Sequence, residues 1–173
     1  MISFETSSPE IDESALENEK PRQLVERLAI EKAKAVSARY PDALIIGSDQ
    51  VALHGEQIIG KPHTHERAVE QLRQASGKSI ELFTGLCLFN ARTGSTQSLV
   101  EPFVVHFKTL SDQIINCYLH KEQPYNCAGS VRSEGLGVAL IDRYEGDDPA
   151  ALIGLPLIRL VTMLENENYE LLV

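Results

Sequence analysis

The sequence is poor in cysteine and has no cluster of basic residues, and both shortages limit what the protein can do. Its three cysteines, Cys87, Cys117 and Cys127, are odd in number and show no Cys-x-x-Cys spacing. This pattern indicates free thiols in a reducing compartment and argues against a disulfide framework or a zinc site. The net charge of −9 without a basic patch argues against a nucleic acid polymer as a partner.

Long apolar segments are also missing. No stretch has the length of a transmembrane helix and no signal peptide is present, so we expect a cytoplasmic protein without membrane contact. The close histidines His63 and His65 are two residues apart, which does not place them on one helical face. Solvated turn residues therefore explain this pair better than metal ligation does. The length of 173 residues, with 43% hydrophobic and 24% charged residues, fits one globular domain over residues 1–173.

Apolar periodicity predicts interspersed helices and strands. Strands are predicted at residues 1–5, from 43 onward, at 80–90, at 98–107 and in the segment ending at 141. Helices are predicted at about 22–40 and 64–75, after 111–112, and from about 156. Pro102 inside a strand indicates an edge position or a bulge. This order of elements predicts an α/β or α+β domain with a mixed sheet.

The most informative stretch is the apolar run 44–47 followed by Asp49, with Lys61 on the next turn. A short apolar run bounded by turn residues predicts a buried strand, and Asp49 lies at or just past its end. A carboxylate at a strand end and a nearby lysine suit water activation and phosphate binding. A capping aspartate and a surface lysine explain the same spacing equally well.

Several short strings occur in one order along the chain and together cover nearly all of it. They are Ile11-Asp12-Glu13, Glu31-Lys32-Ala33, Gly47-Ser48-Asp49-Gln50-Val51, Gly60-Lys61-Pro62, Phe83-Thr84-Gly85, Ala128-Gly129-Ser130 with Ser133-Glu134-Gly135, and Gly154-Leu155-Pro156-Leu157. In this order they resemble the Maf (septum formation protein) family of nucleoside triphosphate pyrophosphatases. Each string alone is weak, but seven in sequence are specific.

The resemblance implies an α/β fold of the Maf/inosine-triphosphatase type, with a twisted mixed sheet flanked by helices in two lobes, a nucleotide cleft between the lobes, and often a homodimer. It also implies hydrolysis of a nucleoside triphosphate to a monophosphate and pyrophosphate with a divalent cation, Mg²⁺ or Mn²⁺. Such an enzyme would keep modified nucleotides out of nucleic acid.

Matched to the family, Asp49 takes the role of proton acceptor, and Lys32 and Lys61 take the roles of phosphate contacts. Glu13 takes the role of an acidic residue at the metal or the phosphates, and the metal ligands implied are Asp49 and Glu13. The chemistry is coherent, because water attacking the α-phosphorus needs a base and the phosphate oxygens need nearby positive charge. Glu13 as a plain loop carboxylate and Lys32 as an exposed helix lysine remain alternatives.

Two positions suggest the substrate. Members of the family that act on dTTP and UTP typically carry threonine after the aspartate and Ile-Gln-Gly in the later loop, where this chain has Gln50 and Glu134. The pair resembles the branch that hydrolyses 7-methyl-GTP. A carboxylate accepts the N–H donors of guanine and complements the positive charge of the methylated base. The alternative for Glu134 is a surface residue at a strand end.

The family's N-terminal Ser-x-Ser-Pro-x-Arg segment has no counterpart here, and Ser7-Ser8-Pro9-Glu10 does not replace it because Glu10 has the wrong charge. The sequence therefore leaves three hypotheses for the function. They are a 7-methyl-GTP pyrophosphatase, a catalytically weak nucleotide-binding or regulatory protein linked to cell-division arrest, and a pyrophosphatase for dTTP, UTP or another nucleotide.

Overall fold

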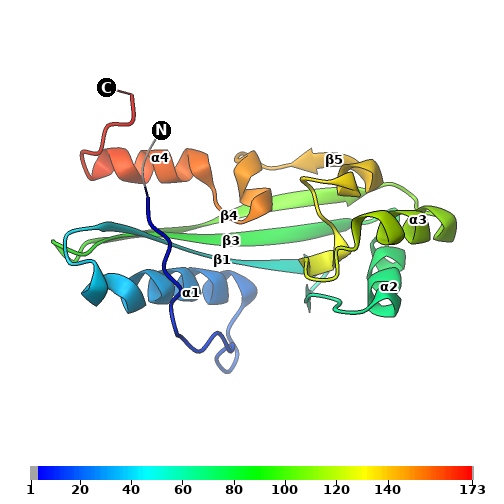
Figure 1. Ribbon diagram of the computed structural model, residues 1–173, viewed down its shortest axis with the longest axis horizontal. Coiled ribbons are helices and arrows are strands. Elements are labelled where there is room, and N and C mark those ends of the chain that lie inside the picture. The colour runs from blue at the N-terminus through cyan, green and yellow to red at the C-terminus, as the bar shows by residue number, and fades with distance from the viewer. Residues whose placement is uncertain (1–3, 173) are drawn as a thin grey trace. The chain divides into compact units, whose positions relative to one another are not determined.

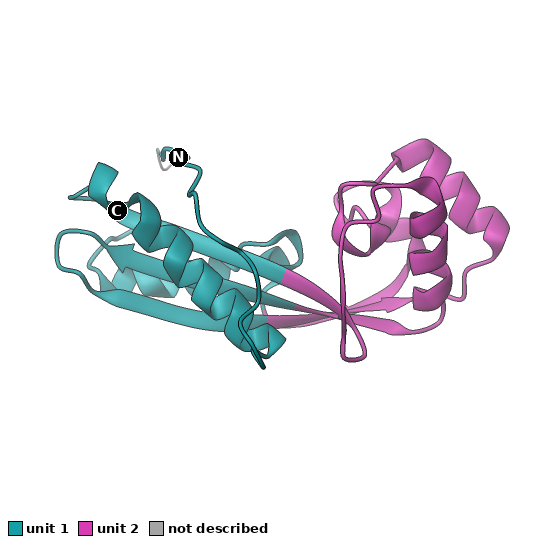
Figure 2. Ribbon diagram, turned by 90° about the horizontal axis from the view of Figure 1, so that it is seen from below, with its two compact units in different colours: residues 1–50, 83–101, 148–173 teal, residues 51–82, 102–147 magenta. Residues whose placement is uncertain are grey.

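The computed structural model describes residues 4–172, and its chain divides into two compact units (Figure 2). Unit 1 contains the chain up to Gln50, Phe83–Glu101, and the chain from Asp148 onward. Unit 2 contains Val51–Leu82 and Pro102–Asp147. The predicted single domain over residues 1–173 stays a prediction. No helix within residues 4–172 is long and apolar enough to cross a membrane.

One five-stranded open sheet has the order β2-β1-β3-β4-β5. Its strands are β1 (Leu44–His54), β2 (Gln57–Ile59), β3 (Ser79–Asn90), β4 (Thr96–Phe107) and β5 (Ile141–Glu145). β1 and β4 run from unit 1 into unit 2, and β3 runs the opposite way. β2 and β5 are each antiparallel to their neighbours, so the whole sheet is antiparallel.

In unit 1 the sheet is covered on both faces by helices. α1 (Pro21–Val36) lies on one face and α4 (Leu157–Asn166) on the other (Figure 1). The apolar residues Ala29, Ala33 and Val36 of α1 pack with Ile45 and Cys87. On the opposite face α4 supplies a second cluster, made by Leu86, Leu88, Leu160, Met163 and Leu164. On β3, Cys87 therefore packs against α1, whereas its neighbours Leu86 and Leu88 pack against α4, as the period of two of a strand requires.

Two glycines let α1 approach the sheet closely. A Cβ atom at Gly47 would collide with the carbonyl oxygen of Ala29, and one at Gly85 would collide with the carbonyl oxygen of Val25. No side chain fits between the helix backbone and these strands, so glycine is required at both positions. The glycines thereby bring α1, and with it Lys32, close to β1.

In unit 2 the helices α2 (His65–Ala75) and α3 (Asp112–Glu122) pack together with the 3-10 helices η2 (Ala128–Ser130) and η3 (Leu136–Leu140). Leu72, Ile115 and Leu119 are fully buried in this unit. The guanidinium of Arg73 donates to both carboxylate oxygens of Asp112 at 2.8 and 2.9 Å, which ties α2 to the start of α3.

Most predicted elements are confirmed, because their signals are local. Thr64 and Ser111 accept backbone N–H bonds from Arg67 and Ile114 and start α2 and α3 as expected. The α/β class is also confirmed. Pro102 lies outside the register of β4 with β5, which covers Val104 to Phe107, so β4 is locally an edge there.

Three structural expectations need correction. The sheet is antiparallel where a mixed sheet was expected, because β1, β3 and β4 alternate in direction. The segment expected as a strand up to Ile141 is the 3-10 helix η3, and β5 takes the following residues, which were expected to be a loop. Of the strand expected at residues 1–5, Met1–Ser3 lie outside the described residues and Phe4 and Glu5 are irregular.

Candidate functional site

Three of the predicted catalytic residues meet in unit 1. The ammonium nitrogen of Lys32, on α1, lies 2.6 Å from Oδ1 of Asp49 on β1 and 2.9 Å from Oε1 of Glu13. The side chains of Asp49 and Lys32 are 13% and 19% exposed, whereas that of Glu13 is 59% exposed. Gly47 and Asp49 are two residues apart on β1 and therefore face the same side of the sheet. The close approach of α1 at Gly47 places Lys32 over Asp49.

The electrostatics of this cluster suit a base held near positive charge. Burial raises the pKa of Asp49 above its ordinary value of 3.8, the nearby charge of Glu13 raises it further, and Lys32 offsets part of the rise. Burial works against the charge of Lys32, but its bonds to Asp49 and Glu13 raise the lysine pKa overall, so Lys32 stays protonated. The raised pKa brings Asp49 closer to the range in which a general base works well.

A second ion pair holds the segment that carries Glu13. Nε and Nη2 of Arg27, on α1, bind both carboxylate oxygens of Glu19 at 2.7 and 2.8 Å, and Nη2 also donates to the carbonyl oxygen of Ser14 at 3.0 Å. The pairing with Arg27 lowers the pKa of Glu19 to about 2. Arg27 stands in none of the family-like motifs, and the only sequence signal for it is its spacing of four residues from Glu31 on a predicted helix.

Gln50 follows Asp49 along β1 and points to the other face. Its Nε2 donates to Oγ1 of Thr84, on β3, at 2.7 Å and to the carbonyl oxygen of Ala151 at 2.6 Å. Ala151 belongs to the 3-10 helix η4 (Pro149–Ile153). The sequence contains Thr84 in a family-like string, but no local pattern indicates that it contacts Gln50.

Lys61 and Glu134 belong to unit 2. Lys61 follows β2, is exposed, and has no ion pair with another residue in the range 4–172. Glu134 is exposed in the turn before η3 and accepts a hydrogen bond from the hydroxyl of Ser133 at 2.9 Å. Its own backbone N–H and Ser133 lower the pKa of Glu134, so this carboxylate is ionised at neutral pH.

The oxygen donors of unit 1 fit a hard divalent cation. Mg²⁺ is commonly held by one or two carboxylates together with substrate phosphates, and Asp49 and Glu13 supply two carboxylates at one ammonium group. Within residues 4–172 no three His, Cys, Asp or Glu side chains form a metal cage. His65 is no solvated turn residue, since its ring nitrogens lie 3.1 Å from the hydroxyl of Tyr125 and 3.2 Å from Oδ1 of Asn116.

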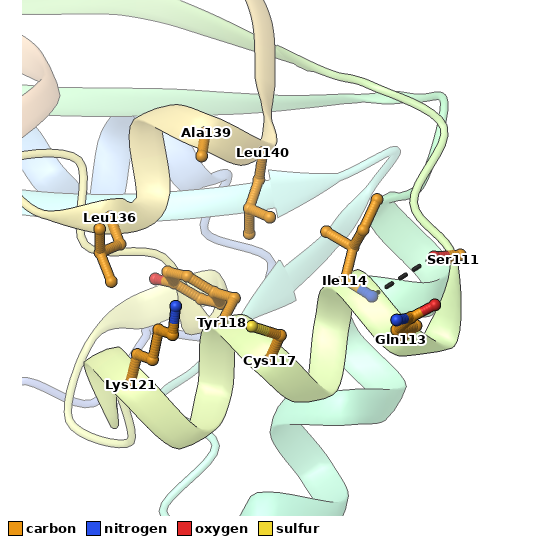
Figure 3. Close-up of a pocket in the computed structure, with 9 residues that line it drawn as sticks. All are labelled: Ser111, Gln113, Ile114, Cys117, Tyr118, Lys121, Leu136, Ala139 and Leu140. Atoms are coloured by element: carbon orange, nitrogen blue, oxygen red, sulfur yellow. Dashed lines mark hydrogen bonds between the residues drawn. The ribbon is translucent and has the colours of Figure 1, made fainter.

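A pocket of about 510 Å³ lies within unit 2 between α3 and η3 (Figure 3). Ile114, Cys117 and Tyr118 of α3 line one side, and Leu136 and Leu140 of η3 line the other. None of the predicted site residues lines this pocket, so it is separate from the cluster around Asp49.

Comparison with known proteins gives the same family as the motifs. The family model described as "Maf-like protein" matches residues 1–167. Proteins from Nitrosococcus oceani and Colwellia psychrerythraea, both named 7-methyl-GTP pyrophosphatase, are each 57% identical over 171 residues, covering 99% of this chain and 86% of each relative. A protein of the same name from Pseudoalteromonas translucida is 52% identical, over 99% of this chain and 85% of its own length. The chain belongs to the Maf family.

Proposed function

We propose that this protein is a hydrolase that cleaves 7-methyl-GTP to 7-methyl-GMP and pyrophosphate. The observation that carries the proposal is that three relatives 52–57% identical to it, each matching 99% of the chain, share the name 7-methyl-GTP pyrophosphatase. The cluster of Asp49, Lys32 and Glu13 supports the chemistry, since it joins a base to a fixed positive charge. These similarities do not favour a catalytically weak nucleotide-binding or regulatory protein, or a pyrophosphatase for dTTP, UTP or another nucleotide.

In the proposed reaction Asp49 accepts a proton from a water molecule as the water oxygen attacks the α-phosphorus. The bond from the α-phosphorus to the oxygen bridging to the β-phosphorus breaks, and pyrophosphate leaves with that oxygen. The ammonium of Lys32 offsets charge on the phosphate oxygens and keeps Asp49 in place through its 2.6 Å contact. For Lys61 a role at the phosphates rests on its sequence motif alone.

Asp49 and Glu13 would hold a divalent cation together with the substrate phosphates. When bound, Mg²⁺ or Mn²⁺ lowers the pKa of the attacking water and screens the phosphate charge. Glu13 suits this role because its exposed side chain can turn from Lys32 toward a cation without leaving a buried charge unpaired. A cytoplasmic location and a homodimer remain parts of the proposal that rest on the sequence.

Base selection is assigned to Gln50 and Glu134. The ionised carboxylate of Glu134 accepts N–H donors of guanine and complements the positive charge that methylation adds, whereas uracil and thymine would present carbonyl oxygens to it. This role predicts that Glu134 contributes to selectivity and not to the chemical step.

The test is pyrophosphate release from 7-methyl-GTP, GTP, UTP and dTTP with Mg²⁺ or Mn²⁺. The wild-type protein should prefer 7-methyl-GTP, and Asp49→Asn should lower kcat by about 10²–10⁴-fold because the base is lost. Glu134→Gln should reduce the kcat/KM ratio of 7-methyl-GTP over UTP, while the exposed control Glu56→Gln leaves it unchanged. A folded wild-type protein that binds 7-methyl-GTP without turnover would instead support the nucleotide-binding alternative.

A further inference from the structure

Gln50 is held by a network that leaves one of its polar atoms free. Its Nε2 has two hydrogen atoms and two close acceptors, Oγ1 of Thr84 at 2.7 Å and the carbonyl oxygen of Ala151 at 2.6 Å. Thr84 in turn donates its hydroxyl hydrogen to the same carbonyl at 3.0 Å. Both donors of the Gln50 amide are therefore satisfied inside the protein.

This network also fixes which way the amide faces. A carbonyl oxygen can only accept hydrogen bonds, so rotating the amide by half a turn would set Oε1 of Gln50 against the oxygen of Ala151. Oε1 therefore points away from η4. No donor within residues 4–172 reaches it, and no buried side-chain oxygen or nitrogen in that range lacks a partner, so Oε1 is open to solvent.

The residues around the network are hydrogen-bonded to one another. Thr84 is fully buried, and Asp148, 1% exposed, accepts the backbone N–H groups of Ala150 at 3.1 Å and Ile158 at 2.7 Å. Asp148 thereby joins η4 to the start of α4 and holds the Ala151 carbonyl in position. Two residues before Gln50, Oγ of Ser48 lies 2.7 Å from the carbonyl oxygen of Gly154, which ties β1 to the end of η4.

We propose that Thr84 is a positioning residue for substrate selection, which holds the Gln50 amide so that its Oε1 accepts a hydrogen bond from the nucleotide. This inference rests on the proposed function. An acceptor at this point favours a base rich in N–H donors, and 7-methylguanine carries an exocyclic amine where uracil and thymine carry oxygens. Asp49 leaves β1 on the opposite face, so Thr84 acts on selection and not on proton transfer.

The test compares kcat/KM for 7-methyl-GTP and UTP in variants of Thr84. Thr84→Val keeps the shape of the side chain but removes the hydroxyl, so the selectivity ratio should fall about three- to tenfold, the effect of one lost hydrogen bond. Thr84→Ser keeps the hydroxyl and should retain the ratio within about twofold. Thr96→Val, at an exposed position of β4, is the matched control and should leave the ratio unchanged.

A double-variant experiment with Gln50→Ala shows whether Thr84 acts through Gln50. Gln50→Ala should lower the ratio, and adding Thr84→Val to it should lower the ratio no further, because the amide it positions is gone. An unchanged ratio in Thr84→Val, or an equal additional loss in the double variant, would overturn the inference. A merely structural role of Thr84 would change thermal stability without this dependence on Gln50.

One measurement needs no variant that could fail to fold. In the wild-type protein both side-chain amide protons of Gln50 should exchange with water more slowly than those of the exposed Gln113, as seen by NMR. Equally fast exchange would overturn the inference. Dissociation constants for 7-methyl-GTP and UTP distinguish failure of the proposed function from failure of the role of Thr84. A wild-type protein that shows no selectivity in turnover or in binding refutes both. A selective wild-type protein whose selectivity is unaffected by Thr84→Val refutes only the role of Thr84.

Discussion

Asp49 and Gln50 are adjacent in sequence and have separate tasks because a strand sends successive side chains to opposite faces. On one face Asp49 meets Lys32 at 2.6 Å, and on the other Gln50 meets Thr84 at 2.7 Å. The sequence motif predicts that both residues lie near the substrate but does not show which neighbours each one has. That difference separates a candidate base from a candidate selectivity residue.

The raised pKa of Asp49 predicts a shift in the pH dependence of activity. The charge of Glu13 is one of its causes, so Glu13→Gln should lower the pKa of Asp49 and leave Lys32 paired with Asp49 alone. Asp49 acts as a base only when ionised, and a lower pKa keeps it ionised at lower pH. The acid limb of kcat/KM should therefore move to lower pH, whatever happens to the maximal rate.

The measurement is a pH profile of kcat/KM for wild type, Glu13→Gln and the control Glu17→Gln. Glu17 lies in the same segment and is exposed, so its loss should not move the limb. If Glu13→Gln leaves the limb in place, or moves it to higher pH, then Glu13 does not act on Asp49 as the structure indicates.

At the scale of elements, the position of α1 against the sheet decides whether the site forms. Gly47 and Gly85 allow the helix backbone to touch β1 and β3, and this contact sets the height of Lys32 over Asp49. The family-like strings at these positions therefore have a structural reason besides their chemistry. A side chain at either glycine would act on the site through the helix.

Gly85→Ala should destabilise the protein by about 3 kcal/mol or more, because the new methyl group would meet the backbone carbonyl of Val25 and not a flexible side chain. For a chain of this size each kcal/mol lowers Tm by about 2–4 °C. Displacement of α1 should also lower kcat. Thermal unfolding followed by circular dichroism measures the first effect and pyrophosphate release the second.

Gly60→Ala is the matched control, since no atom lies within 4 Å of the position its Cβ would take. Its stability should change by no more than about 0.5 kcal/mol. A Gly85→Ala protein that melts with the control would show that α1 can move away from β3 at little cost.

At the scale of the whole molecule, the three cysteines report on different parts of the chain. Cys87 is fully buried in the core of unit 1, and burial raises the pKa of its thiol to about 11. Cys117 is exposed and Cys127 is half-buried, both in unit 2. The thiolate is the reactive form, so exposure and pKa together make Cys87 the least reactive of the three.

Alkylation by iodoacetamide at mildly alkaline pH should therefore modify Cys117 first, Cys127 more slowly, and Cys87 only as the protein unfolds. Adding 7-methyl-GTP to the Asp49→Asn variant should slow the modification of Cys87, because a ligand that binds the folded state lowers the unfolded population. Modification of Cys117 should not change. Peptide mass spectrometry over time follows each site, and modification of Cys87 as fast as Cys117 would contradict its placement in the core.

Local patterns were sufficient to predict most helices and strands, the free thiols and the family. α2 and α3 start at the expected residues because a capping threonine or serine acts within three residues of its own position. The grouping of Asp49, Lys32 and Glu13 was also suggested by motifs, although their contacts were not. These features depend on residues that are near one another in sequence or that occur in a recognisable order.

Contacts between distant segments decided the rest. η3 replaces an expected strand, where Glu122 of α3 accepts the backbone N–H of Leu136 at 2.7 Å. The orientation of Gln50 depends on Thr84 and Ala151, which are 34 and 101 residues further along the chain. No periodicity encodes such pairs, because a hydrogen bond between segments needs the whole sheet and η4 to be in place first. Only the tertiary structure brings the donors and acceptors within reach of each other.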